Sequence, residues 1–130
     1  MIFIDSNIPM YILGSPHTNK LRSLRLVERY LAVPFVTSVE VLQEILHRYH
    51  SIGKLHEGVQ VYDYLVHLVD DVWDVTREDI GLAKEILLQA TGMGSRDAVH
   101  AACMLNHHVF QIMTFDRGFR KLKSLTVLDK

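Results

Sequence analysis

Acidic side chains stand at several points where the sequence could assemble a site for a divalent cation. Asp5 and Asp116 each follow a short apolar run, and Asp97 lies in the first turn of an apolar helical segment. A fourth acid comes from a segment that holds both Glu40 and Glu44. At about 4 Å, carboxylates repel one another by several kcal/mol in a protein-like dielectric unless a cation lies between them. Carboxylate oxygens suit Mg²⁺ or Mn²⁺, and such an ion supports hydrolysis of phosphodiesters.

Helical geometry distinguishes the two candidate glutamates. At about 100° per residue, Glu40 lies roughly 170° from the centre of the apolar stripe of its helix, and Glu44 roughly 130°. Glu40 also stands three residues after Thr37, the position of a capping-box glutamate, so we expect it to face solvent. The alternative for Glu44 is an ion pair with Arg48 one turn later. We therefore predict that Glu44 is the fourth acid. The stripe consists of Val41, Leu42, Ile45, Leu46 and Tyr49.

Three further side chains could support the acids. The amide of Asn7 could hold a carboxylate, and the hydroxyl of Thr114 could orient a water or a phosphate oxygen. His100 stands three residues after Asp97 on the same helix. It could hydrogen-bond that carboxylate, contact a substrate, or simply be a satisfied buried histidine.

Each aspartate also has a purely structural alternative. Asp5 could cap the first helix, Asp97 could complement a helix dipole, and Asp116 could serve an Asp-Arg-Gly turn. Their shared placement at strand ends favours a common site, because ligands gather at the carboxyl ends of parallel strands.

Short apolar runs alternate with amphipathic segments along the whole chain. This order predicts an α/β fold, a three-layer α/β/α sandwich around a short, mostly parallel sheet. Thr76 and Asp79 mark one helix start, and Ser95 marks the start of a largely buried helix. The expected strands cover residues 2–4, 35–36, 72–75, 110–114 and 126–128, and the expected helices cover 9–13, 18–31, 37–49, 57–69, 76–90 and 95–106, with a turn and helical stretch over 116–123.

Composition limits the class of protein. The chain has 130 residues, which predicts one domain spanning residues 1–130. A net charge of −1 argues against a general nucleic-acid coat protein but allows an enzyme with a local basic rim. No apolar run reaches the ~18 residues of a membrane helix, and the first residues lack the features of a signal peptide. With Cys103 as the only cysteine, we expect a cytoplasmic protein without a membrane partner.

The histidines do not by themselves form a zinc motif. The chain contains 8 of them, and His47 and His50 lie one turn apart as two ligands might. No third ligand stands at a suitable spacing, so we interpret these residues as solvated or packing side chains.

Four segments in order resemble the motifs of the PIN-domain nucleases. Asp5-Ser6-Asn7 resembles the first motif, and Ser38 with Glu44 keeps the six-residue spacing of the second. Asp97-Ala98-Val99-His100-Ala101-Ala102 is similar to the third, and Thr114-Phe115-Asp116-Arg117-Gly118-Phe119 is similar to the fourth. The likeness covers essentially the whole chain, with Asn7 standing where many relatives have Ser or Thr.

The resemblance implies a PIN fold and endonuclease action on RNA with Mg²⁺ or Mn²⁺. Asp5, Glu44, Asp97 and Asp116 would be the acidic catalytic and metal-binding residues. The size of the chain resembles the VapC toxins, which are homodimers silenced by a cognate antitoxin protein.

Three other functions fit parts of the sequence. The same site could process ribosomal or transfer RNA without an antitoxin. A phosphate-accepting signalling module has a similar build, but a lysine would be expected at the late strand end where Thr114-Phe115-Asp116 stands. A PIN domain that only binds RNA would be expected to lack some of the acids.

Overall fold

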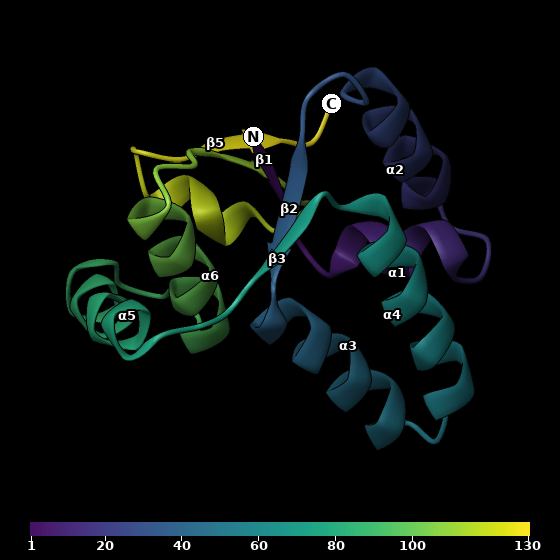
Figure 1. The fold of residues 1–130 in the computed structure, drawn as a ribbon, viewed down its shortest axis with the longest axis horizontal. Coiled ribbons are helices and arrows are strands. Elements are labelled where there is room, and N and C mark those ends of the chain that lie inside the picture. Colours follow the sequence, from purple (N-terminus) through teal and green to yellow (C-terminus); the bar gives the residue numbers. More distant parts are fainter.

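Five short parallel strands form the centre of the fold (Figure 1). The computed structural model describes residues 1–130. The strand order is β3-β2-β1-β4-β5, and β1 pairs with β2 through Ile2–Phe35 and with β4 through Ile2–Gln111. All pairings are parallel, so every strand ends at the same edge of the sheet. The strands are β1 (Ile2–Ile4), β2 (Phe35–Ser38), β3 (Asp71–Trp73), β4 (Gln111–Met113) and β5 (Thr126–Leu128).

Helices cover both faces of this sheet. Figure 1 shows α1, α2 and α4 on one side and α5 and α6 on the other, with α3 leaving the end of β2. α3 packs against both α4 and α6 and so connects the two layers. None of the helices is long and apolar enough to cross a membrane. The helices are α1 (Asn7–Leu13), α2 (Thr18–Arg29), α3 (Val39–Ser51), α4 (Leu55–Leu68), α5 (Arg77–Gln89), α6 (Ser95–Asn106) and the 3₁₀ helix η1 (Arg117–Lys121).

The core is centred on β1 and α6. Ile2, Phe3 and Ile4 are completely buried, because a central parallel strand has helices over both of its faces. In α6, the small residues Ala98, Ala101 and Ala102 are also completely buried, and the helix packs closely against α5. The predicted α/β/α class and the predicted order of elements are therefore confirmed, and the sheet is fully parallel.

The start of α3 differs from the prediction. Thr37 and Ser38 belong to β2, where the Thr37 hydroxyl donates a 3.0 Å hydrogen bond to the carbonyl of Ile4 on the neighbouring strand. Ser38 is the N-cap, and its side chain makes no capping hydrogen bond. The capping box predicted for Thr37 and Glu40 is therefore wrong, because the Thr37 hydroxyl is used to join two strands.

The aromatic residue of β3 ties the edge of the sheet to the end of α6. The ring of Trp73 is buried and stacks on the imidazole of His107, with ring centroids 3.8 Å apart and planes inclined by 3°. The Nδ1 atom of His107 lies 2.9 Å from the carbonyl oxygen of Cys103. The last turn of α6 is thus held against β3.

The predicted capping box at the start of α5 is present. The Thr76 hydroxyl accepts from the backbone N–H of Asp79, and the Asp79 carboxylate accepts from the backbone N–H of Thr76. Asp79 is buried and also accepts a 2.7 Å hydrogen bond from the amide of Asn106 at the end of α6. Burial raises the pKa of Asp79, but these hydrogen bonds outweigh it and leave the pKa below its usual value.

Removing this carboxylate should destabilise the fold. We predict that Asp79→Ala lowers the free energy of unfolding by about 1–3 kcal/mol, because the Thr76 N–H and the Asn106 amide lose their acceptor. Urea unfolding followed by circular dichroism measures this. The exposed neighbour Glu78→Ala is the control, with an expected change within about 0.5 kcal/mol. Equal effects of the two substitutions would contradict the assigned role.

Candidate metal centre

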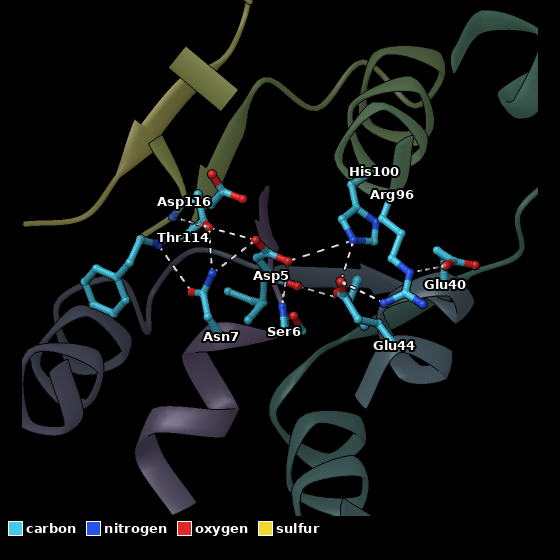
Figure 2. A network of polar contacts seen from close by, with 12 residues as sticks. Asp5, Ser6, Asn7, Glu40, Glu44, Arg96, His100, Thr114 and Asp116 are labelled. Atoms are coloured by element: carbon cyan, nitrogen blue, oxygen red, sulfur yellow. Dashed lines mark hydrogen bonds and ion pairs between the residues drawn. The ribbon is translucent and has the colours of Figure 1, made fainter. Parts of the chain in front are cut away.

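Asp5 is the anchor of the candidate site. It follows β1, is 4% exposed, and its backbone N–H donates to the carbonyl of Met113 on the adjacent strand. Its Oδ1 atom accepts a 2.7 Å hydrogen bond from the Ser6 N–H. Its Oδ2 atom accepts from the Thr114 hydroxyl at 2.7 Å and from the Asn7 amide at 3.3 Å (Figure 2). Burial nevertheless raises the pKa of Asp5 above its usual value.

Asn7 and Thr114 join the carboxyl ends of β1 and β4. The Asn7 amide donates to the Thr114 hydroxyl at 3.0 Å, and its oxygen accepts from the Phe115 N–H at 3.2 Å. The Thr114 hydroxyl also accepts from the Asp116 N–H at 3.0 Å. Asn7 makes the contact with Asp5 that the sequence suggested. The single proton of Thr114 is directed at Asp5, which leaves none for the water or phosphate oxygen proposed from the sequence.

Glu44 and His100 approach Asp5 from two other helices. The Nε2 atom of His100 lies 3.5 Å from Glu44 Oε1 and 3.9 Å from Asp5 Oδ1. One ligand atom of each residue lies within 4.8 Å of the others. His100 is completely buried, and neither its ring nitrogens nor Glu44 Oε1 has a hydrogen-bond partner. Burial lowers the pKa of His100, but the surrounding carboxylates outweigh burial and raise the pKa above its usual value.

His100 therefore occupies a position that the sequence left open. The sequence allows a hydrogen bond between His100 and Asp97, the acid one turn earlier in α6. The short contacts of the His100 Nε2 atom are instead with Glu44 and Asp5. His47 and His50, by contrast, are exposed on α3 and belong to no cluster of potential metal ligands.

Arg96 is a residue of the site that sequence reasoning missed. Its guanidinium lies 3.8 Å from Glu44 Oε2 and 3.9 Å from Glu40 Oε1. Partial burial raises the pKa of Glu44, but His100, Ser6 and Arg96 lower it to below the usual value. A cation in the first turn of a helix interacts unfavourably with the helix dipole. The position of Arg96 in the sequence therefore indicates that it needs a carboxylate partner.

Glu44 is more buried than Glu40, as predicted. The predicted reason, a capping role for Glu40, is not the one that the structure gives. The Glu44 side chain is 17% exposed and the Glu40 side chain 29%. Glu44 faces the centre and makes no ion pair with Arg48, whereas Glu40 stands beside Arg96 and not fully in solvent.

Asp97 and Asp116 form the second part of the site. Both flank Gly118, where an added Cβ atom would lie 3.1 Å from Asp116 Oδ1 and 3.6 Å from Asp97 Oδ2. Asp116 is exposed and accepts a 2.8 Å hydrogen bond from the Gly118 N–H, so the turn suggested by the sequence does form. Burial, the adjacent Asp116 and the more distant Asp5 raise the pKa of Asp97 to about 7.

The donor set fits a hard divalent cation. Asp5, Glu44, Asp97 and Asp116 all lie at the carboxyl edge of the sheet, and the electrostatic influence of Asp5 reaches both Glu44 and Asp97. Glu44 Oε1 is buried without a donor, and burial together with the neighbouring Asp116 raises the pKa of Asp97. Carboxylate oxygens in this state are suitable ligands for Mg²⁺ or Mn²⁺.

Comparison with known proteins identifies the family of the chain. The family model described as PIN domain matches residues 2–125. The chain belongs to the PIN-domain family, and the resemblance drawn from its four motifs is confirmed.

Within that family the chain is similar to VapC proteins. It is 44% identical over 122 residues to Ribonuclease VapC13 of Mycobacterium tuberculosis, which covers 92% of each chain. Among solved structures, VapC20 of Mycobacterium tuberculosis, described as a Sarcin-Ricin loop cleaving toxin, has a TM-score of 0.76 at 20% identity and covers 92% of this chain and 93% of that one. VapBC2 of Rickettsia felis, bound to a DNA fragment from its promoter, has a TM-score of 0.76 at 16% identity and covers 98% of each chain.

The raised pKa of Asp97 makes stability depend on pH. Its pKa is about 7 in the folded protein against an ordinary value of 3.8, so folding favours the protonated form. The contribution of Asp97 to the free energy of unfolding is therefore greatest below pH ~4 and is lost as the pH rises through ~7. We predict that Asp97→Asn stabilises the metal-free protein above pH 7 and changes it little near pH 4.

Urea titrations of both proteins in the presence of a chelator measure this difference. The exposed Asp63→Asn in α4 is the matched control and should change little at either pH. Adding Mg²⁺ or Mn²⁺ should stabilise the wild type more than Asp97→Asn. If Asp97→Asn changed the stability equally at both pH values, the link between the protonation of Asp97 and folding would be disproved.

Proposed function

We propose that this chain is a divalent-metal-dependent endoribonuclease of the VapC type, a toxin that hydrolyses phosphodiester bonds of RNA. What supports the proposal is the cluster of Asp5, Glu44 and His100, with Asp97 and Asp116 paired beside Gly118, in a chain of the PIN family. The 44% identity to a protein named as a ribonuclease supports the reaction class. The proposal also takes residues 1–130 as one nuclease domain acting in the cytoplasm.

The four acids would hold Mg²⁺ or Mn²⁺. When bound, such a cation would lower the pKa of a water molecule and offset the charge that develops at phosphorus. The chain's own contribution is to fix the carboxylates before the substrate arrives. Asp5 is oriented by the Ser6 N–H and the Thr114 hydroxyl, so its free lone pairs have a defined direction.

His100 and Arg96 act as positioning residues in this proposal. His100 lies between Asp5 and Glu44 from the buried side, and Arg96 contacts Glu44 from the exposed side. Both limit the repulsion between carboxylates that are too close to be stable alone. They keep the Glu44 carboxylate near Asp5, although Glu44 lies at the border of the packed face of α3.

We further propose a cognate antitoxin protein and a second copy of the chain as partners. The Rickettsia felis structure similar to this fold is a VapBC complex bound to promoter DNA, which supports a protein partner of antitoxin type. The homodimer follows from the family resemblance and needs a direct measurement of mass in solution.

Cleavage should depend on the metal and on Asp97. Purified protein is expected to cut RNA with Mg²⁺ or Mn²⁺ and to stop when a chelator removes the ion. Asp97→Asn is expected to abolish cleavage while circular dichroism shows an intact fold, because the amide cannot supply the negative charge the ion needs. Gel analysis of labelled RNA fragments measures both. Full activity of Asp97→Asn would rule out the assigned site.

Growth experiments distinguish a toxin from an RNA-processing enzyme. Expression of the wild type is expected to arrest growth, and co-expression of a small protein encoded beside it should restore growth. Sequencing of RNA ends after brief induction, with Asp97→Asn as the inactive control, would identify the cleaved bond. Normal growth together with specific trimming of a precursor RNA would favour processing instead.

The close approach at Gly118 gives a second test of the site. A methyl group there would press on Asp116 Oδ1 and stand near Asp97 Oδ2. The Asp116 carboxylate would have to shift by a few tenths of an ångström. Because a displacement of about 1 Å can cost about a hundredfold in rate, we predict that Gly118→Ala lowers RNA cleavage roughly two- to tenfold. Gly81→Ala, in open space on α5, is the matched control and should keep full activity. Unchanged cleavage by Gly118→Ala would show that this pair of aspartates tolerates movement.

A further inference from the structure

One set of potential ligand atoms lies much closer together than the rest of the candidate metal centre. Asp5, Glu44 and His100 each place one ligand atom within 4.8 Å of the others, and no other three residues of these types do so. Asp97 and Asp116 stay outside this set. The closest set of three therefore contains a ring nitrogen and not only the carboxylate oxygens expected from the sequence.

Each of the three residues has an unused lone pair on the atom that faces the other two. Asp5 Oδ1 accepts one hydrogen bond, from the Ser6 N–H, and a carboxylate oxygen can accept two. Glu44 Oε1 and His100 Nε2 lie 3.5 Å apart and have no hydrogen-bond partner. Figure 2 shows the His100 ring directed at both carboxylates. Three atoms that can each donate a lone pair to a cation thus face one another.

Burial makes these unused atoms unusual. The whole chain has four buried side-chain polar atoms without a hydrogen-bond partner, and three of them are Glu44 Oε1 and the two ring nitrogens of His100. The fourth is the hydroxyl oxygen of Ser38, the last residue of β2. Such atoms are rare in folded proteins, because each has given up its contact with water. Their concentration in two neighbouring side chains is the pattern of a ligand-binding position.

The charge around His100 suits a divalent cation. Asp5 and Glu44 bring two negative charges, which would repel an anion. Arg96 lies 3.8 Å from Glu44 Oε2 and so leaves Glu44 Oε1 on the side of His100. Histidine binds metals as the neutral ring, so an ion at this position would replace a proton as the positive charge between the two carboxylates.

We propose that His100 binds the divalent cation directly through Nε2, together with Asp5 and Glu44, and that this nitrogen makes the centre prefer Mn²⁺ to Mg²⁺. The inference rests on the proposed metal centre and specifies its ion. Mg²⁺ takes oxygen ligands and retains several waters, whereas imidazole suits transition-metal ions. Mn²⁺ is the ion of that group that carboxylates also suit. A centre built from acids alone would have no nitrogen with which to make this distinction.

Electron paramagnetic resonance of bound Mn²⁺ detects such a nitrogen without any substitution. The probe is Mn²⁺ alone, added below one equivalent to wild-type protein that a chelator has freed of other metals. A ring nitrogen bound to Mn²⁺ should produce nitrogen echo modulation, and labelling histidine with the heavier nitrogen isotope should change its frequency. His100→Gln should abolish the modulation. His47→Asn changes an exposed histidine one turn after Glu44 on α3 and should leave the modulation intact.

Affinities for the two ions distinguish a ligand from a residue that only positions Glu44. Loss of a residue that merely supports a ligand costs about 10- to 100-fold in metal affinity, so His100→Gln should weaken Mn²⁺ binding at least about tenfold. The amide oxygen of Gln can lie near the position of Nε2, so Mg²⁺ binding should change much less. His100→Asn is too short to reach and should weaken both ions. A purely positioning role would lower both affinities of His100→Gln by the same factor.

The outcomes separate this inference from the nuclease proposal. If the wild type cleaves RNA but its bound Mn²⁺ shows no nitrogen, the inference is overturned and the nuclease stands; this holds even if His100→Gln does not fold. If the nitrogen signal depends on His100 but no RNA is cut with either ion, the metal centre stands and the nuclease proposal fails. If His47→Asn removes the signal, the ligand is His47 and the inference is wrong. Equal affinity of the wild type for Mn²⁺ and Mg²⁺ would overturn the preference.

Discussion

Mutual repulsion among carboxylates at one end of a parallel sheet is the constraint around which this structure is arranged. A fully parallel sheet brings the ends of all its strands to one edge, so residues more than a hundred positions apart, such as Asp5 and Thr114, become neighbours. Asp5 is the most constrained of them, because it is buried and accepts hydrogen bonds from Ser6, Asn7 and Thr114. Arg96 and His100 lie beside Glu44 and make its approach to Asp5 tolerable.

The same edge provides both the reactive centre and its surroundings. Asn7 lies in the first turn of α1, joins the network around Asp5, and also lines a groove that leads to Tyr11. Phe115 donates its backbone N–H to Asn7 and presents its ring to Tyr11. A substitution in the first turn of α1 would therefore disturb both the carboxylates and the groove between α1 and α3 that Asn7 and Tyr11 line.

Periodicity and strand ends predicted most of the fold from the sequence. The order of elements, the buried helix from Ser95 to Asn106 and the capping box at Thr76 follow from local patterns, and all are present. The start of α3 was mispredicted because the Thr37 hydroxyl bonds to a neighbouring strand, a contact that no local pattern contains. The partners of His100 and Arg96 were missed for a related reason, since both depend on how α6 crosses α3. The four acids remain a prediction for catalysis, although the structure brings them to one edge.

The stacking of His107 on the only tryptophan has a practical consequence. Trp73 lies on an edge strand, and its ring is covered by a residue at the end of α6, the helix that also carries Asp97 and His100. An imidazole in face-to-face contact alters the emission of an indole, so detachment of this helix would change the intrinsic fluorescence of the protein. The chain thus contains its own optical reporter for the docking of the helix that carries Asp97 and His100, with no label attached.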